Sequence, residues 1–204
     1  MLTRAIAGIG LAVAVLATGG LTTAAVARSQ PDSAWSPVAG APAPLQYEQR
    51  SWGDPKTELG MVIQAPNGWK MVKLSTFEVK FTSPDGQRNL RVNGAPKDQP
   101  IKTAADAKYA VVSSSTPAFK LISREAGTTR ATNPAFAGVV FHHQTLTYTY
   151  TDPARGRRLV VDRFVSADDL PHTLFEVSTG GRPQDAAALT AITAKATEDF
   201  IRLP

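Results

Sequence analysis

Residues 66–93, PNGWKMVKLSTFEVKFTSPDGQRNLRVN, decide the fold, because two alternating segments flank a turn sequence. In residues 77–82 (FEVKFT) apolar and polar side chains alternate, which is the period-two pattern of a strand with one buried face. Residues 84–86 (PDG) supply a fixed φ, a side chain that closes a local turn, and a residue free to adopt positive φ. Residues 89–93 (NLRVN) alternate again as the returning strand. The stretch predicts a β-hairpin.

Other segments of the chain also have the composition of strands. We expect strands at residues 58–65, 69–74, 120–125, 138–151, 157–166 and 173–179. The turn sequence DPARG joins the two longest strands. If Asp152 pairs with Arg157, Tyr148 lies opposite Val161 and Tyr150 lies opposite Leu159. Both faces of this pair carry apolar side chains, as in a sheet that is covered on both sides.

Two helices are expected between and after these strands. Residues 103–106 (TAAD) have the form of a capping box and begin a short helix whose apolar stripe is Ala105, Tyr109 and Val112. Gly180-Gly181 is expected to break the last strand, before a final helix from Pro183 to Ile201. Its buried face is Leu189, Ile192, Ala196 and Phe200. The order of elements predicts an α+β fold with a mostly antiparallel sheet.

Composition excludes several classes of function. The 204 residues include 43% apolar residues and no cysteine, so a disulfide framework, a thiolate nucleophile and a Cys-ligated metal are excluded. The net charge is +5, and its densest basic cluster is Arg155, Arg157 and Arg158. Because no basic stripe with stacking aromatic residues is present, nucleic acid is not expected as a partner.

The N-terminal residues have the pattern of an export signal. Arg4 precedes the uncharged apolar run 5–18, and small residues lead to Ala25-Val26-Ala27, an A-x-A cleavage site. We therefore expect residues 1–27 to be a signal peptide; the alternative is an uncleaved membrane anchor over residues 5–26. Residues 28–57 are a Pro/Ala-rich linker and lead-in, with residues 45–54 left open as a possible entry into the fold. The domain is expected at residues 58–204.

Several short motifs of the chain together resemble a known family. They are Pro66-Asn67-Gly68-Trp69, Phe81, Pro84-Asp85-Gly86, Leu90 and Val92, followed by a middle helix, Tyr/Thr-rich strands and a C-terminal helix. The chain resembles actinobacterial exported domains of the LpqN/LpqT lipoprotein type over about residues 58–203. The resemblance implies the PsbP-like α/β/α sandwich, a central antiparallel sheet with helices on both sides.

The resemblance implies an accessory or binding domain of the cell envelope, with a protein or lipid partner. The chain departs from the family because it has no cysteine to carry a lipid after the signal peptide. It also has no kinase domain, whereas similar domains look to be attached to the outer side of some actinobacterial serine/threonine kinases. The expected function is therefore a secreted or surface-exposed, non-catalytic binding protein; the alternatives are an exported hydrolase and a membrane-anchored extracytoplasmic domain.

The histidines, serines and aspartates do not form the pattern of a reactive centre. His142 and His143 are adjacent on a strand and point to opposite faces, so they do not share a metal, and His172 adds no ligand spacing. A hydrolase triad would have to combine residues 113–115, one of these histidines and Asp162, but no Gly-x-Ser-x-Gly elbow is present. Residues 180–183 (GGRP) are a plain helix start in preference to an anion cradle.

No catalytic, cofactor-binding or metal-binding residue is therefore assigned, and no cofactor is expected. The residues most suited to contact a ligand or partner are Trp35, Tyr148, Tyr150, His143, Arg155 and Arg157. The simpler interpretation is that both tyrosines fill core or cross-strand positions while the neighbouring threonines serve as strand formers. Trp69 and Phe81 are expected in the core. Contact with a membrane is expected only if the N-terminal segment is not cleaved.

Overall fold

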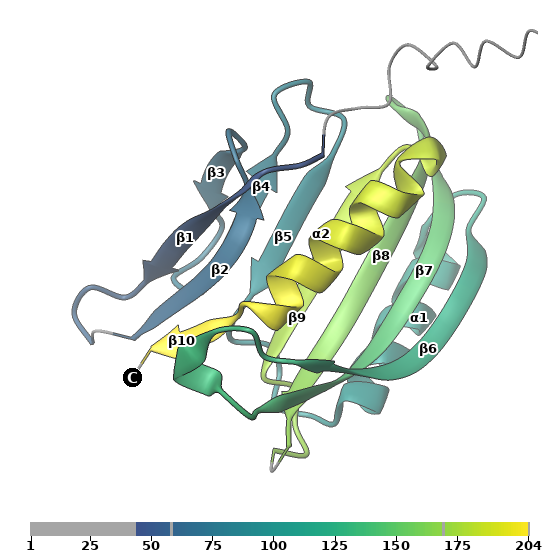
Figure 1. Ribbon diagram of the computed structural model, residues 1–204. Helices are drawn as coiled ribbons and strands as arrows, with labels where there is room; N and C mark the ends of the chain where they lie inside the picture. Colours follow the sequence, from purple (N-terminus) through teal and green to yellow (C-terminus); the bar gives the residue numbers. More distant parts are fainter. Residues whose placement is uncertain (1–43, 58, 169, 204) are drawn as a thin grey trace, which may run out of the picture. The chain divides into compact units, whose positions relative to one another are not determined.

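The computed structural model describes residues 44–57, 59–168 and 170–203, which form an α+β domain (Figure 1). A seven-stranded antiparallel sheet has the order β3-β4-β5-β9-β8-β7-β6. Its strands are β3 (Lys70–Lys73), β4 (Glu78–Thr82), β5 (Asn89–Asn93), β6 (Lys120–Arg130), β7 (Val140–Asp152), β8 (Gly156–Ala167) and β9 (Phe175–Gly181). The expected signal peptide and Trp35 lie outside the described residues.

The hairpin predicted from residues 66–93 is present as β4 and β5. Val79 pairs with Val92 and Phe81 with Leu90, and all four side chains are fully buried. Gly86 closes the turn with a φ of +69°, a conformation that a residue without Cβ adopts at little cost. Alternation along both strands therefore places one apolar face in the main core.

A second, three-stranded sheet packs on that same core, in the order β1-β2-β10. Its strands are β1 (Tyr47–Gly53), β2 (Gly60–Pro66) and β10 (Ile201–Leu203). Strand structure therefore begins before residue 58, because the lead-in at residues 45–54 pairs with β2 as β1. The expectation that the last helix reaches Ile201 is wrong: Ile201 opens β10, which pairs with Val62 and its neighbours.

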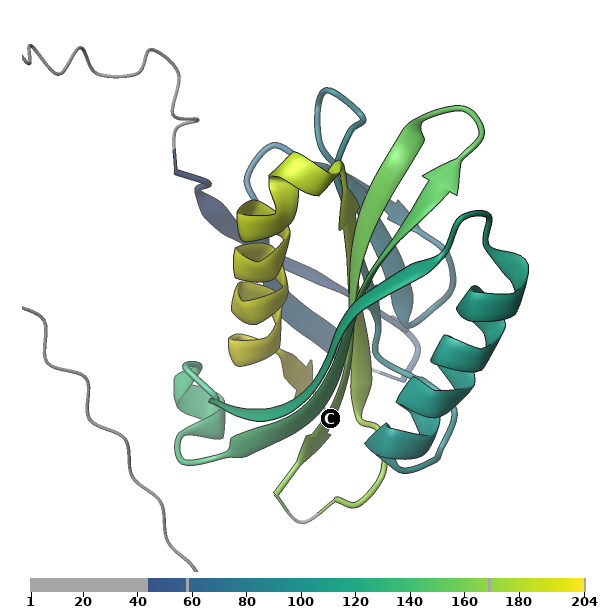
Figure 2. The same ribbon diagram turned by 90° about the vertical axis from the view of Figure 1, so that its right-hand side faces the viewer.

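The two α-helices of the described residues lie on opposite faces of the large sheet (Figure 2). Helix α1 (Ile101–Ser115) packs Ala104 and Ala105 against apolar side chains of β7 and β8. Helix α2 (Ala186–Glu198), preceded by the 3₁₀ turn η2 (Pro183–Asp185), lies on the face that also carries the small sheet. Leu189, Ile192 and Ala196 form the buried face of α2, as predicted; Phe200 is buried too but follows the end of the helix.

The start of α1 differs from the capping box expected at residues 103–106. The helix begins three residues earlier, with Pro100 in place of Thr103 at the N-cap position, and no side chain caps its N-terminus. Asp106 instead forms ion pairs with Lys102, 3.0 Å away within the helix, and with Arg124 on β6. The carboxylate of Asp106 therefore pairs with two cations and does not cap the helix. Tyr109, expected in the buried stripe, is 37% exposed.

Gly180 and Gly181 continue β9, although they were expected to end it. They pair with Asn89 of β5 and Leu159 of β8, and both are buried. A Cβ on Gly181 would lie 3.1 Å from Leu189 of α2, so glycine allows the helix to approach the strand closely.

The β7–β8 pairing is shifted by one residue from the expected register. Asp152 pairs with Gly156, so Tyr148 lies opposite Val160 and Tyr150 lies opposite Arg158. The carboxylate of Asp152 accepts hydrogen bonds from the backbone N–H groups of residues 154 and 155, at 2.9 and 3.0 Å. These bonds close a three-residue loop, which leaves the following glycine in the strand with a φ of +71°.

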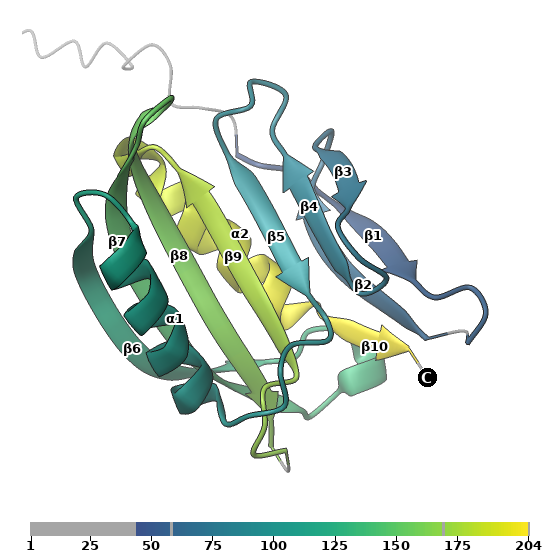
Figure 3. The ribbon, with the colours of Figure 1, turned by 180° about the vertical axis from the view of Figure 1, so that it is seen from behind.

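The two faces of the large sheet are covered unequally. Helix α2 and the small sheet together cover one face, where the main core lies. On the other face α1 contacts β7 and β8, and β9, β5 and β4 lie beside the helix (Figure 3). This second face therefore leaves polar side chains of three strands accessible next to α1. No helix in the described part of the chain is long and apolar enough to cross a membrane.

Candidate ligand-binding groove

A groove runs along the face of the large sheet that α1 only partly covers. It consists of two adjoining pockets that share Arg91 of β5 and Ser178 of β9, with volumes of about 580 and 160 Å³. We call the larger one the cationic pocket, the smaller one the acidic pocket, and both together the sheet groove. The larger volume lies within the range of sites that hold small ligands.

Four cationic side chains and no acidic ones line the cationic pocket: Lys80, Arg91, Arg155 and Arg158. Two aromatic side chains, Tyr148 and Tyr150, also line it. Arg158 is only 2% exposed, which is unusual because the desolvation of a guanidinium is costly unless a counter-charge is close. The alternation of β8 places Arg158 on the same face as Val160, Asp162 and Phe164.

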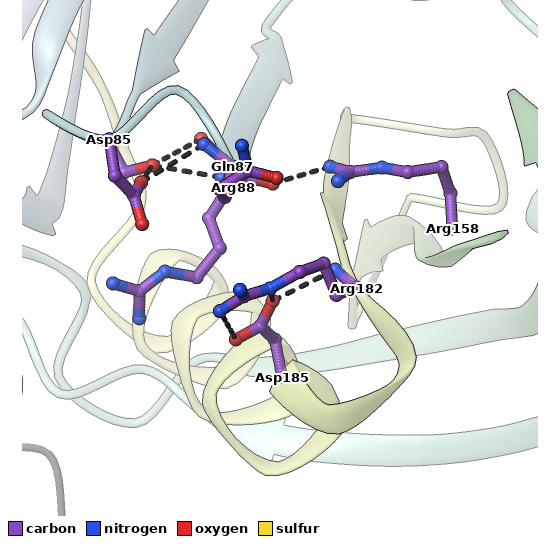
Figure 4. Close-up of polar contacts among 7 residues, drawn as sticks. Asp85, Gln87, Arg88, Arg158, Arg182 and Asp185 are labelled. Carbon is purple, nitrogen blue, oxygen red and sulfur yellow. Dashed lines mark hydrogen bonds and ion pairs between the residues drawn. The ribbon is translucent and has the colours of Figure 1, made fainter. Parts of the chain in front are cut away.

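The β4–β5 turn holds Arg158 in place. Nη2 of Arg158 donates a hydrogen bond to the backbone carbonyl of Gln87, and its second terminal nitrogen makes no contact with the other residues drawn (Figure 4). Asp85 orders this turn by accepting hydrogen bonds from the Ser83 hydroxyl (2.5 Å) and the Gln87 N–H (3.0 Å). These hydrogen bonds, led by that from Ser83, lower the pKa of Asp85. The PDG turn thus presents the carbonyl that orients Arg158.

The guanidinium of Arg158 remains incompletely satisfied in this position. Its Nη1 is buried and makes no hydrogen bond with any described residue. A buried donor without a partner costs about 1–3 kcal/mol, and more when it is charged. Such a group is therefore expected to bind an acceptor from outside the chain.

Two of the four cations in the cationic pocket are paired and two are not. Arg91 forms an ion pair with Glu78, and Nε of Arg155 lies 3.5 Å from the Asp152 carboxylate. Among the described residues, neither Lys80 nor Arg158 has a carboxylate within ion-pair distance. After the two paired cations are subtracted, the pocket keeps a surplus of two positive charges.

The acidic pocket contains the carboxylates of Glu78, Asp162 and Glu176 next to α1. Oδ2 of Asp162 accepts a hydrogen bond from the Tyr148 hydroxyl at 3.0 Å and lies 3.5 Å from Nζ of Lys108. Oδ1 of Asp162 is buried and has no hydrogen-bond partner among the described residues. The acidic pocket therefore offers a free acceptor, whereas the cationic pocket offers a free donor.

Burial and neighbouring charges perturb two groups in the groove. Burial raises the pKa of Glu176; the Lys108 ammonium opposes this, and the carboxylate of Asp162 adds to it. Burial also raises the pKa of Tyr148, and the adjacent Asp162 charge raises it further. Tyr148 is therefore a neutral hydrogen-bond donor at physiological pH, which fixes the orientation of Asp162.

The structure brings together only some of the residues that the sequence singles out as contacts. Tyr148, Tyr150 and Arg155 line the cationic pocket. Arg157 lies on the other face, where its Nη2 donates to the Thr149 hydroxyl at 3.3 Å. His143 is also on that face, because successive β7 side chains point to opposite faces and His143 is an odd number of residues away from Tyr148. These two residues therefore do not share a site with the tyrosines.

His143 lines a separate pocket of about 390 Å³ between β6, β7 and α2. Burial and, to a smaller extent, the nearby Arg163 guanidinium lower its pKa to about 4. Its Nδ1 lies 3.4 Å from the Thr145 hydroxyl. The imidazole is therefore neutral at physiological pH and packed against polar neighbours of the strand.

The residues considered for a hydrolase triad lie apart. The hydroxyls of Ser113, Ser114 and Ser115 each bond to a backbone carbonyl within α1. His142 contacts Asp168 at 3.2 Å, and Asp162 contacts Tyr148 on the α1 face. No nucleophile–base–acid arrangement is thus formed from these residues.

The remaining candidates for a metal or anion site also lie apart. His172 pairs with Asp98, far in sequence from the other two histidines. Within the described residues, no group of three or more His, Asp or Glu side chains is placed to hold a metal ion. The backbone N–H of Arg182, at the expected helix start, donates to Asp185 (2.9 Å), which forms a capping box there.

Sequence reasoning did not identify Arg158, Lys80 or Arg91 as groove residues. The expected register placed Tyr150 opposite Leu159, and so put Arg158 on the face away from the tyrosines. A signal for Arg158 was nevertheless present: it is a cation at an inward position of the apolar strand segment RRLVVDRFV. Lys80 and Arg91 carried no such signal, because alternating charges are typical of any exposed strand face.

No family model matches the chain, and no curated protein matches it. Among solved structures it is similar to LpqN of Mycobacterium tuberculosis, described as involved in cell envelope biogenesis, at 13% identity and a TM-score of 0.46 over 78% of this chain and 92% of that one. It is similar to PA94 of Pseudomonas aeruginosa, of unknown function, at 12% identity and a TM-score of 0.44, over 77% of this chain and 99% of that one. It is also similar to the Ran-binding protein Mog1p of Saccharomyces cerevisiae at 7% identity and a TM-score of 0.43, over 76% of this chain and 96% of that one.

Proposed function

We propose that this chain is an exported, non-catalytic binding protein of the bacterial cell envelope that holds its ligand in the sheet groove. The groove supports binding because each of its two pockets is lined by a residue with a buried polar atom that has no partner among the described residues: Nη1 of Arg158 and Oδ1 of Asp162. A ligand with one hydrogen-bond acceptor and one donor would satisfy both atoms. Polar atoms exposed to water would not need such a ligand, because water satisfies them. This pair of unpaired atoms is the observation that carries the proposal.

Export and the fold class complete the proposal. The charged residue, apolar run and A-x-A site of residues 1–27 support export through a cleaved signal peptide. Helices on both faces of the large antiparallel sheet support the PsbP-like α/β/α sandwich. The partner is a lipid or another envelope component, and the groove residues perform recognition with no chemical step.

The test is native mass spectrometry of the full-length protein purified from its own envelope, together with extraction of any bound molecule. The blocking variant is Ser178→Trp, because Ser178 lies where the two pockets meet. Ala187→Trp is the matched control, since Ala187 is exposed on α2, on the other face of the sheet. Circular dichroism melting establishes that each variant is folded.

We expect the unaltered protein and Ala187→Trp to carry the same additional mass, and a folded Ser178→Trp to lose it. An equal load on both variants would place the ligand elsewhere. An unaltered protein that carries no additional mass would contradict the binding proposal itself. Turnover of ester, peptide or glycan substrates that is abolished by His143→Ala at an unchanged melting temperature would favour the hydrolase alternative instead.

A further inference from the structure

We infer that the sheet groove recognises a phosphate ester whose phosphate enters the cationic pocket and whose neighbouring hydroxyl or amine group reaches the acidic pocket. This inference rests on the proposed binding function and adds the chemistry of the ligand. It follows from the surplus charge, the unpaired donor of Arg158, and the arrangement of the two pockets on one face.

The charge of the cationic pocket favours phosphate over a single carboxylate. Lys80 and Arg158 carry the surplus of two positive charges, and no acidic side chain lines the pocket. A phosphate monoester carries about two negative charges at neutral pH, which matches that surplus. A carboxylate would neutralise only one of the two cations.

The geometry of Arg158 suits an oxyanion. One terminal nitrogen donates to the Gln87 carbonyl, which orients the guanidinium, while Nη1 has no hydrogen-bond partner among the described residues. A guanidinium that is oriented before binding loses little entropy when it bonds to a phosphate oxygen. Because Arg158 is 2% exposed, the contact would form in a desolvated site, where charge-assisted hydrogen bonds are strongest.

The acidic pocket defines the rest of the ligand. Oδ1 of Asp162 needs a donor, and the carboxylate of Glu176 lies in the same pocket. Hydroxyl and ammonium groups are donors, whereas a second phosphate would be repelled by these carboxylates. Since the pockets adjoin at Arg91 and Ser178, the donor group must lie next to the phosphate in the ligand.

The experiment is isothermal titration of the full-length protein with inorganic phosphate, glycerol, glycerol 3-phosphate, and phosphatidylcholine vesicles with and without lysophosphatidic acid, a lipid whose headgroup is a phosphate monoester beside a free hydroxyl. The test variant is Arg158→Met, which removes the buried donor. The matched control is Arg130→Met, which makes the same change in net charge at an exposed position of β6. Melting curves establish that both variants are folded.

We expect glycerol 3-phosphate to bind, glycerol not to bind, and Arg158→Met to weaken binding tenfold or more, which corresponds to about 1.4 kcal/mol. Arg130→Met should leave the affinity within about twofold, or roughly 0.4 kcal/mol. Binding of the soluble ester alone would identify a soluble phosphate ester as the source. Binding only to vesicles that contain lysophosphatidic acid would identify a lipid headgroup.

Three results would overturn the inference: no phosphate-bearing probe binds, both variants lose affinity equally, or Arg158→Met binds as well as the unaltered protein. These outcomes are separable from failure of the proposed function. A bound molecule that contains no phosphorus and is lost in Ser178→Trp would sink the phosphate assignment and leave the binding function intact.

Discussion

Replacement of Arg158 by methionine should leave the domain as stable as before or make it more stable. Arg158 is fully buried, and its one hydrogen bond, to Gln87, contributes about 1.5–3 kcal/mol as a charge-assisted bond. Against this stands the cost of a buried guanidinium that, among the described residues, has no partner for Nη1 and no carboxylate within ion-pair distance. Buried ionic groups replaced by apolar side chains of similar volume are often neutral or stabilising by about 1–4 kcal/mol.

The net change expected for Arg158→Met is a rise of about 0–2 kcal/mol in the free energy of unfolding. For a domain of this size that is a rise of up to about 8 °C in melting temperature. Arg158→Lys should be less stable than Arg158→Met, because the ammonium keeps the buried charge and loses the planar fork. Urea unfolding of the three proteins measures both differences.

A loss of more than about 2 kcal/mol in Arg158→Met would refute this reasoning, because it would mean that Arg158 is kept for stability. So would an Arg158→Lys protein that is more stable than Arg158→Met. If Arg158 is retained for binding at a cost in stability, Arg158→Met should instead be more stable than Arg158→Lys.

Three further predictions concern the core, pH and the C-terminus. Phe81→Ala should lower the free energy of unfolding by about 3–5 kcal/mol, because Phe81 is completely buried in the main core. A loss below about 1 kcal/mol in chemical unfolding would contradict that packing. The free energy of unfolding should fall by about 1–2 kcal/mol as the pH drops from 6.5 to 4, because His143 has a pKa of about 4 in the folded protein and about 6.5 in the unfolded chain. His143→Gln should flatten this dependence on pH. An unchanged slope would show that His143 is not its source. A chain that ends at Gly181 lacks α2 and β10, whose Ile192, Ala196 and Phe200 belong to the main core, so it should not melt cooperatively in calorimetry.

The sequence predicts the strands and the C-terminal helix well because local patterns encode them. Alternation in residues 77–82 and 89–93 marks the β4–β5 hairpin, and the spacing of Leu189, Ile192 and Ala196 marks the buried face of α2. The second sheet was missed for the opposite reason. Strand β10 forms only because β2, far away in sequence, offers it an edge to pair with.

The groove was harder to predict because it depends on a one-residue register and on two distant turns. Tyr148, Tyr150 and Arg155 were identified, but a one-residue shift in β7–β8 pairing moved Arg158 opposite Tyr150. The hydrogen bond from Arg158 to Gln87 joins residues 71 positions apart, so no local pattern contains it. The groove exists because α1 covers only part of the sheet, and the position of α1 on the sheet is set by tertiary packing and not by a local sequence pattern.

The most direct test of the account is a crystal structure of the protein with the molecule that co-purifies with it, or with glycerol 3-phosphate. The account predicts electron density in the cationic pocket, with an oxygen atom within hydrogen-bond distance of Nη1 of Arg158. Density found instead in the apolar pocket of about 410 Å³ between Phe136, Leu170 and Leu174, with the sheet groove empty, would contradict it.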